Sequence, residues 1–458
     1  MRVLTLLVVL LLATPVTAGD LPSVEHFTLR NGVDVYFVAR PDIPLVRADL
    51  IFQVPPEAEP ETRAGLASVT LSSVLLGIEG EATKDLMRDL DRETLLLDPQ
   101  MGAATIGYSL LTSDQHLQGV MSDLGAMLDA PELPAWGIEM LVPSHRAEIR
   151  ARQLDAGATA LRRWYQLALG EHPLTRPRVG TTAGLGAIRR QNVEEFWDRF
   201  LHPDRATLLI TGGVGVDQVR AILERSFASW GRDRETRQVR IERLHPQGDQ
   251  AVVLEHMEGR RQAYIVVGGV LTNPTRKDRA TLAVLDHVLG GSFGSRINRR
   301  LRIESGSTYG VSTTVEPLRD TVTFAVVASA RGEVAPQALG VAIEELTAIG
   351  KSQPIEAREL ARAQAGVAAQ VLLAHATLED TIGLLRQEVR WGWDPTRPEE
   401  WIEAIRQVTA EDVTALAARL LEPDQIAAVV VGDAETLEAP LRALGLPIRV
   451  VGRSAPEE

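Results

Sequence analysis

The chain has 458 residues, 45% of them hydrophobic and 24% charged, which excludes a largely disordered or fibrous protein and allows about two to four domains or halves. Its 61 acidic and 48 basic residues give a net charge of -13, which would repel phosphate backbones and argues against a nucleic-acid partner. The chain has no cysteine, so neither a disulfide nor a lipidated cysteine is available to it.

The first residues have the pattern of a secretory signal peptide. Arg2 is followed by an apolar run over residues 3–13 and by a small-residue cleavage site at 16–18. This run is too short to span a bilayer, and no later stretch reaches the roughly 20 apolar residues that a spanning helix needs. We therefore expect residues 1–18 to be a signal peptide that directs the chain to a bacterial periplasm, with secretion beyond the cell as the alternative.

Apolar periodicity predicts strands and then helices in the segment that follows. Residues 27–29 and 33–37 alternate around the turn Asn31-Gly32, which predicts a hairpin, and a third strand is expected over 46–52. A helix without ionisable side chains, "GLASVTLSSVLLG", is predicted at 65–77, followed by a strand near 103–111. Helical patterns then cover about 136–200, with a break at the prolines 173 and 177, before the strand "ATLLITGG".

The second part of the chain repeats this order after an arginine-rich segment, 232–249, which reads as a linker. Strands are expected at 251–254 and 263–270, a helix at 279–289, strands at 309–315 and 321–328, and then long helices. "HPDRATLLITGG" (202–213) also matches "EPDQIAAVVVGD" (422–433) without a gap. Chance could explain the shared Pro-Asp pair, but the shared strand, glycine and element order favour duplication. We predict an α+β fold of two duplicated halves, 19–231 and 250–452, each an antiparallel sheet covered by helices, with a tail at 453–458.

Two motifs resemble those of the pitrilysin/insulinase-type zinc peptidases, a processing-peptidase-like family of inverzincins. They are "ETRAGLA", leading into the helix at 65–77, and "VLGGSFGSRINRRLRIESGSTYGVST", residues 288–313. The resemblance covers essentially the whole mature chain and implies that the helix after Gly-Leu-Ala corresponds to the one carrying His-x-x-Glu-His. Here the three motif positions are Ser68, Leu71 and Ser72.

The sequence therefore predicts no metal site in this chain. Zinc needs imidazole, thiolate or carboxylate ligands, which hydroxyl and aliphatic side chains cannot replace. His145 and Glu148 share a helical face, and Glu148 lies where the family's third ligand would fall, but we expect a solvated or ion-paired face there. Ser72 and Ser73 are interpreted as packing residues, because no neighbouring histidine or lysine would activate them as nucleophiles.

The resemblance implies a role for Arg302 and Tyr309, which in the family lie in the noncatalytic half and donate hydrogen bonds to the carbonyl of a bound peptide. Spacing alone favours an ordinary reading, in which Arg302 pairs with Glu304 and Tyr309 fills a sheet edge, whereas the surrounding "LRIESGSTYG" favours the donors. The stretch Gly290, Gly291, Ser292, Phe293 and Gly294 is a candidate peptide contact or a plain turn. Trp391 and Trp393 are interpreted as core residues.

These features predict the noncatalytic subunit of a periplasmic heteromeric zinc metallopeptidase. A partner subunit with His-x-x-Glu-His would hold the zinc, and this chain would bind peptide and supply Arg302 and Tyr309. The alternative is a peptide-binding or scaffold subunit that makes no catalytic contribution. A third hypothesis is an autonomous peptidase with unrecognised metal ligands.

Overall fold

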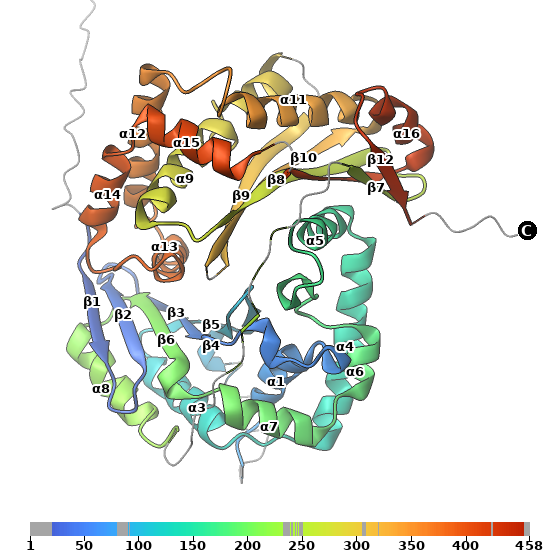
Figure 1. Cartoon of the computed structure of the whole chain (residues 1–458). Coiled ribbons are helices and arrows are strands. Elements are labelled where there is room, and N and C mark those ends of the chain that lie inside the picture. The colour runs from blue at the N-terminus through green and yellow to red at the C-terminus, as the bar shows by residue number, and fades with distance from the viewer. Residues whose placement is uncertain are drawn as a thin grey trace, which may run out of the picture.

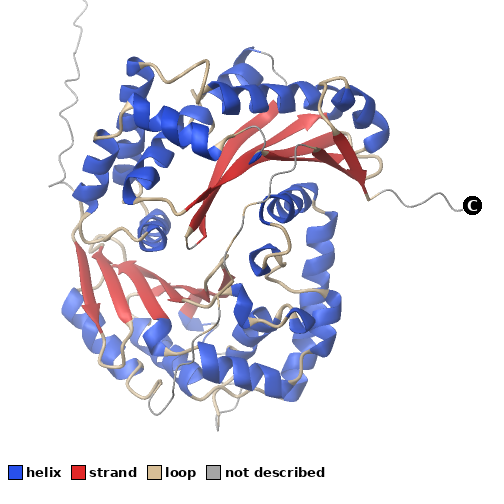
Figure 2. Cartoon of the chain, in the orientation of Figure 1, coloured by secondary structure: helices blue, strands red, loops and turns tan. Residues whose placement is uncertain are grey.

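The computed structural model describes residues 21–79, 90, 92–231, 239, 241–242, 244, 246, 251–304, 308–318, 320–422 and 425–452. The predicted signal peptide, the tail and most of the predicted linker lie outside these residues. Figure 1 shows two halves, each a sheet with helices packed around it, and Figure 2 shows the same layers by type of secondary structure. In the described part of the chain, none of the helices has the length and apolarity that crossing a membrane requires.

The N-terminal half contains six strands and seven helices of six residues or more among the described residues. Its strands are β1 (Val24–Thr28), β2 (Asp34–Ala39), β3 (Leu45–Phe52), β4 (Thr94–Met101), β5 (Ile106–Ser113) and β6 (Ala206–Gly212). Its helices are α1 (Leu66–Val74), α3 (Leu117–Asp129), α4 (Ala135–Leu154), α5 (Ala156–Leu169), α6 (Thr182–Ala187), α7 (Arg190–Phe200) and α8 (Val216–Ser226). The predicted hairpin turn is confirmed, because Gly32 has φ +100° and its N–H donates to the Leu29 carbonyl at 2.9 Å.

The C-terminal half repeats this plan. Its strands are β7 (Val252–His256), β8 (Gln262–Thr272), β9 (Thr308–Leu318), β10 (Thr321–Arg331), β11 (Ala427–Gly432) and β12 (Ile448–Val451). Its helices are α9 (Arg276–Leu289), α10 (Arg296–Asn298), the π-helical η6 (Arg299–Glu304), α11 (Ala335–Ala348), α12 (Ala357–Leu373), α13 (Leu378–Trp391), α14 (Pro398–Arg406), α15 (Ala410–Leu420) and α16 (Ala434–Arg442).

The two sheets share a strand order, which confirms the predicted duplication. The orders are β1-β2-β6-β3-β5-β4 and β12-β7-β11-β8-β10-β9, so the last five strands of each correspond one to one. The pairs β2/β6 and β7/β11 are parallel, whereas the next three pairs in each sheet are antiparallel. The sheets are therefore mixed rather than wholly antiparallel, because β6 and β11 come back beside an early strand only after long helical crossovers.

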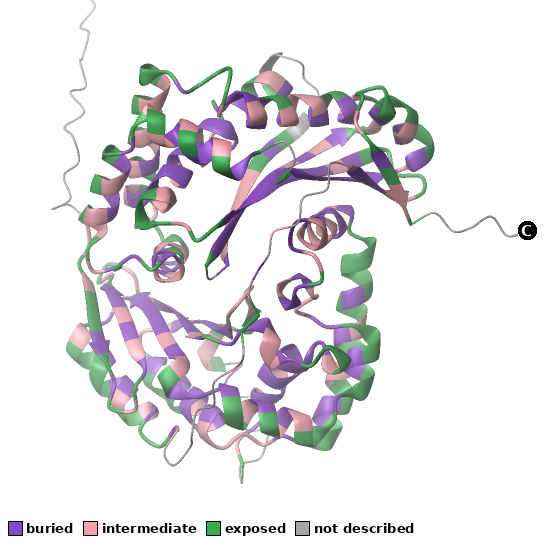
Figure 3. Ribbon diagram, in the orientation of Figure 1, coloured by how far each residue is buried: buried purple, intermediate pink, exposed green. Residues whose placement is uncertain are grey.

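Each half has its own hydrophobic core between the sheet and its outer helices. The N-terminal core includes Phe37, Leu50 and Trp230, and the C-terminal core includes Phe324, Leu285 and Leu346; all six side chains are at most 2% exposed. Figure 3 shows buried residues along both sheets and along the inner sides of the helices. With no cysteine, these cores carry the stability, at about 1.5–3 kcal/mol for each large apolar side chain that is buried.

The two halves contact each other through two corresponding helices, each of which packs on the sheet of the other half. The α5 helix packs on the sheet of the C-terminal half, and α13 packs on the sheet of the N-terminal half (Figure 1). Trp164 of α5 is fully buried, and its indole N–H donates to the Ala427 carbonyl at 2.9 Å. On α13, Ile382 and Leu385 are fully buried.

Ion pairs reinforce this exchange, one on each exchanged helix. Arg163 of α5 pairs with Glu255 of β7 at 2.6 Å, and Arg386 of α13 pairs with Asp49 of β3. Asp49 is 3% exposed and also accepts a hydrogen bond from the Ser109 hydroxyl at 2.6 Å. The buried carboxylate is thus fully engaged, as a charge in a protein interior has to be.

Candidate functional site

The α1 helix occupies the place where the resemblance predicts metal ligands. Leu71 is fully buried, Ser68 is 7% exposed and Ser72 is half-buried. The hydroxyl of Tyr108 donates to the Leu71 carbonyl at 2.9 Å, which ties α1 to β5. Zinc binds imidazole, thiolate or carboxylate groups, so the side chains at these three positions do not fit it.

His145 of α4 lies against this part of α1. Its Nδ1 is 3.0 Å from the Leu141 carbonyl and its Nε2 is 3.0 Å from the Ser68 hydroxyl. A carbonyl only accepts, so Nδ1 carries a hydrogen, and in the neutral ring Nε2 accepts from Ser68. Both ring nitrogens are therefore engaged by protein atoms.

The predicted solvated or ion-paired face of α4 is half right. Glu148 is exposed and accepts hydrogen bonds from Arg152 at 2.8 and 3.1 Å, as expected. The expectation is wrong for His145, which is 7% exposed because it packs against α1. Among the described residues, no three or more His, Cys, Asp or Glu side chains are grouped so that they could hold a metal ion.

Arg302 and Phe293 form an exposed pair in the C-terminal half. Arg302 belongs to η6, and its guanidinium carbon lies 4.9 Å from the centre of the Phe293 ring, in cation–π contact. Phe293 is 66% exposed and Arg302 is also exposed. Two members of the sequence-predicted site are thus brought together, with both side chains accessible to a ligand.

The glycine-rich stretch 290–294 is held from inside by a residue that the sequence analysis did not single out. Asn298 is 5% exposed, and its side-chain amide lies 3.1–3.2 Å from the carbonyls of Gly290, Ser292 and Val311. The N–H groups at the start of the turn are used as well, because those of Gly290 and Gly291 both donate to the Asp286 carbonyl. The turn is therefore anchored at its base, and Phe293 stands out from it.

Other arginines of the same motif have structural partners. Arg296 is 8% exposed, binds both carboxylate oxygens of Glu359 at 2.6 and 2.9 Å, and donates to the Gln353 carbonyl at 2.7 Å. Arg300 pairs with Glu344 and Glu345 at 2.9 and 2.7 Å. These contacts fix the segment that precedes Arg302.

Tyr309 lies in β9, the edge strand of its sheet, at an irregularity. Thr308 pairs with Ala330 and Gly310 pairs with the adjacent Ser329, so Tyr309 is the extra residue of a β-bulge. Bulges redirect side chains and often lie near functional sites. The side chains of Tyr309 and Glu304 lie outside the described part of the structure, so the convergence of Arg302 with Tyr309 stays a prediction, as does the alternative pairing with Glu304.

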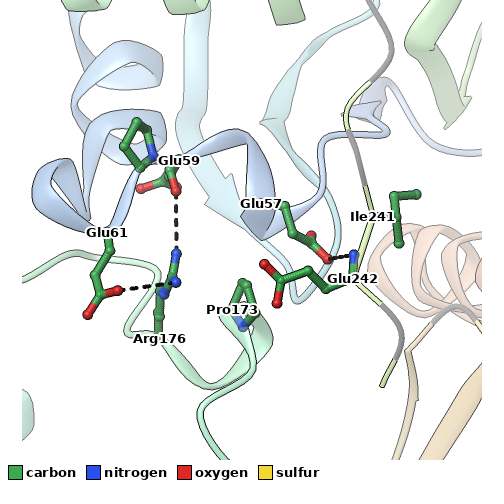
Figure 4. Close-up of a pocket in the computed structure, with 8 residues that line it drawn as sticks. Glu57, Glu59, Glu61, Pro173, Arg176, Ile241 and Glu242 are labelled. Carbon is green, nitrogen blue, oxygen red and sulfur yellow. Dashed lines mark hydrogen bonds and ion pairs between the residues drawn. The ribbon is translucent and has the colours of Figure 1, made fainter. Parts of the chain in front are cut away.

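An acidic cavity of about 770 Å³ opens beside the start of α1. Figure 4 shows Glu57, Glu59 and Glu61 around it, with Arg176 reaching toward Glu59 and Glu61. Glu59 accepts a hydrogen bond from the Gly65 N–H at 2.8 Å, and burial raises the pKa of its carboxyl against the opposing charge of Arg178. These contacts hold the turn that leads into α1, which gives Glu59 a structural role.

The chain is similar to proteins described as peptidases and to one described as a non-peptidase. A family model for the "Peptidase M16 inactive domain" matches residues 187–367. An uncharacterized zinc protease of Mycobacterium leprae is 27% identical over 57% of this chain and 58% of its own length, and one from Streptomyces coelicolor is 25% identical over 60% of each. The chain thus spans less than two thirds of these two relatives.

A longer match is to subunit alpha-2 of the mitochondrial-processing peptidase of Dictyostelium discoideum, 23% identical over 91% of this chain and 94% of that protein. A non-peptidase homolog from Helicobacter pylori is 18% identical over 53% of the chain and 56% of its own length.

Solved structures share the fold. A peptidase M16 inactive domain from Pseudomonas fluorescens superimposes with a TM-score of 0.77 at 18% identity, covering 90% of this chain and 98% of that one. A protease from Helicobacter pylori gives a TM-score of 0.78 at 16% identity, covering 90% and 100%. The matched family model and these relatives make the chain similar to M16 peptidases, the pitrilysin/insulinase-type peptidases that its motifs resemble.

Proposed function

We propose that this chain is the noncatalytic subunit of a heteromeric zinc metallopeptidase, exported to the periplasm. It would bind peptide and present Arg302 and Tyr309 to a partner subunit that carries His-x-x-Glu-His and holds the zinc. One contrast carries the proposal. The helix expected to bear metal ligands has Ser68 and Leu71 packed into the protein, whereas Arg302 is exposed on a segment that buried contacts hold in place.

The chemistry of the two donors suits the proposed role. A guanidinium keeps its charge and offers several N–H donors in a fixed plane, and a phenol offers one directional O–H. Hydrogen bonds aimed at a peptide carbonyl stabilise the negative charge that develops on its oxygen during attack. The likeness to a processing-peptidase subunit over 91% of the chain supports a role as one subunit of such an assembly.

The proposal is tested by reconstituting peptide cleavage. The chain is co-expressed with a candidate partner that carries His-x-x-Glu-His, and cleavage of a quenched fluorescent peptide is measured for each subunit alone and for the pair. We expect cleavage by the pair only. Chelator-sensitive cleavage by the isolated chain would refute the proposal, and fractionation of expressing cells tests export separately.

Variants of the reconstituted pair separate catalysis from scaffolding. Arg302→Ala and Tyr309→Phe are each expected to lower kcat/KM by about tenfold or more, because a donor to the transition state is lost. Arg358→Ala, which removes an exposed arginine of α12, is the matched control and is expected to leave kcat/KM unchanged. Full activity in both test variants would favour the scaffold or peptide-binding subunit instead.

A further inference from the structure

A second cavity, of about 650 Å³, lies in the C-terminal half between α9, α12 and α13, beside β9. None of its lining residues belongs to the proposed Arg302 and Tyr309 site. Figure 1 shows these three helices grouped at one end of the C-terminal sheet. The volume is in the range of pockets that hold small ligands, about 300–1,000 Å³.

A buried carboxyl oxygen that lacks a hydrogen-bond partner among the described residues lies at this cavity. Glu388 of α13 is 4% exposed, and its Oε1 has no hydrogen-bond partner among the described residues. An isolated buried polar atom costs free energy, so nearly all such atoms in native proteins are paired. In this structure no described protein atom donates to Glu388 Oε1, and the lining also contains two buried donors without a partner, Trp393 Nε1 and Arg279 Nε.

The lining is acidic overall. Asp286 of α9 and the residues Glu379 and Asp380 at the start of α13 add three more carboxyl groups, whereas Arg279 is the one basic side chain among the lining residues. Glu379 pairs with Arg47 at 2.7 Å and Asp380 accepts from the Thr377 hydroxyl at 2.7 Å, so these two are already engaged. The carboxyl oxygens of the lining that have no partner among the described residues are Oε1 of Glu388 and Oδ1 of Asp286.

Three tryptophans form one wall. Trp391, Trp393 and Trp401 are 6–8% exposed, and the rings of Trp393 and Trp401 meet edge to face with centres 4.7 Å apart. Aromatic faces here already attract guanidinium groups, because Arg276 lies 4.0 Å over Trp393 and Arg279 lies 5.9 Å over Trp391. Electron-rich aromatic faces and unpaired carboxyl oxygens favour a cation, and the three valines and two leucines of the lining favour an apolar stem.

We propose that this cavity binds an amine or guanidinium cation carried on an apolar stem, whose N–H groups donate to Glu388 and Asp286. The cation would be the side chain of a basic residue in a peptide or a free small amine. A charge-assisted hydrogen bond to a buried carboxylate is stronger than one between neutral groups, which gives such a ligand an advantage over a neutral isostere. This inference is independent of the proposed function, because it needs neither a partner subunit nor peptide cleavage.

The protonation of the two carboxyl groups couples binding to pH. Burial raises the pKa of Glu388 to about 8, with a smaller contribution from the negative charge of Asp394, and burial raises the pKa of Asp286 to about 6. Arg279 on α9 and the pair Glu379 and Asp380 on α13 are the other charges at the cavity. Without a ligand, Glu388 is protonated at pH 7, and an entering cation displaces that proton. Affinity should therefore rise as the pH increases toward 8.

The test is isothermal titration calorimetry of the full chain with three probes. N-acetylarginine methylamide represents a basic peptide residue, N-acetylcitrulline methylamide is its neutral isostere, and agmatine represents a free amine. We expect the arginine probe, agmatine or both to bind, and the citrulline probe to bind at least about tenfold more weakly, because it lacks the charge. Binding of only one cation identifies the source.

Glu388→Gln is the decisive variant, because the amide keeps the shape of the neutral carboxyl group. It should weaken cation binding about tenfold at pH 8 and remove most of the rise in affinity between pH 6 and pH 8. Glu258→Gln, an exposed acid between β7 and β8, is the matched control and should change neither. Far-UV circular dichroism confirms that each variant is folded. Equal binding of the arginine and citrulline probes, binding unchanged in Glu388→Gln, or no binding by either cation would overturn the proposal.

Discussion

The burial of Glu388 predicts how the free energy of unfolding changes with pH. Its carboxyl group is buried and its pKa is raised to about 8 from an ordinary value of 4.5, so the folded chain keeps a proton that the unfolded chain releases. A group with a raised pKa destabilises the folded state progressively as the pH rises from about 4.5 to about 8. Glu388→Gln removes this titration and keeps the size of the side chain.

The expected magnitude follows from the two pKa values. In the unfolded chain, pH 7 lies about 2.5 pH units above the pKa of this carboxyl, and each unit contributes about 1.4 kcal/mol to the free energy of its ionisation. Ionisation at pH 7 therefore favours the unfolded state by about 3 kcal/mol. At pH 5 the same effect is below about 1 kcal/mol. The substitution should therefore stabilise the protein relative to the wild type more at pH 8 than at pH 5, by about 3 kcal/mol.

Urea denaturation followed by tryptophan fluorescence measures this difference at the two pH values, without any cationic ligand in the buffer. Glu258→Gln serves as the control, since an exposed carboxyl should give the same difference from wild type at both pH values. If Glu388→Gln also shows the same difference from wild type at pH 5 and pH 8, the carboxyl does not titrate as its burial requires, and the reasoning fails.

Two further substitutions test the contacts that shape the molecule. Asp49→Asn should destabilise the protein by about 1–3 kcal/mol in urea denaturation, because the buried Arg47 then keeps only Glu379 as a carboxylate partner and the part-exposed Arg386 loses the charge of Asp49. Asn298→Ala should cost about 1–3 kcal/mol, because the carbonyls at the base of the 290–294 turn lose their donor, and limited proteolysis should cut this turn faster than in the wild type. Unchanged urea midpoints would show that these contacts do not contribute as described.

Local patterns predicted most of the fold. The hairpin at Gly32, the helix after Gly65 and the long strands β8 and β10 lie where apolar periodicity and turn residues placed them. The strand β4 was not predicted, because "TLLLDPQM" contains Asp98 and Pro99, which are unfavourable in most strands. The strand forms at the edge of the sheet, where one side has no neighbouring strand. Proline is tolerated there, because its missing N–H is not needed for a hydrogen bond to a neighbour.

The parallel pairing of β2 with β6 was also missed. The alternation of apolar residues in β2 does not indicate that its neighbour is β6, about 170 residues later in the chain. The position of β6 depends on how the intervening helices pack. The exchange of α5 and α13 between the halves has the same origin, since an amphipathic pattern gives the buried face of a helix but not the sheet that covers it.

Long-range contacts also limited the prediction of the site. His145 and Ser68 are 77 residues apart, so their hydrogen bond could not be read from helical spacing on α4. Trp391 and Trp393 are buried, as the sequence predicts, and both also line the cavity. The sequence pattern does not distinguish a core tryptophan from one that lines a cavity. The unpaired carboxyl oxygen of Glu388 likewise becomes apparent only once α9, α12 and α13 are assembled.

The central claim is that this chain holds no catalytic zinc of its own, because Ser68, Leu71 and Ser72 replace the ligand types that the metal requires. The most direct measurement is the metal content of the homogeneous chain, purified without a histidine tag and dialysed after addition of excess zinc, by inductively coupled plasma mass spectrometry. The account predicts zinc far below one ion per chain. One tightly held ion per chain, retained through dialysis at nanomolar free zinc, would contradict it.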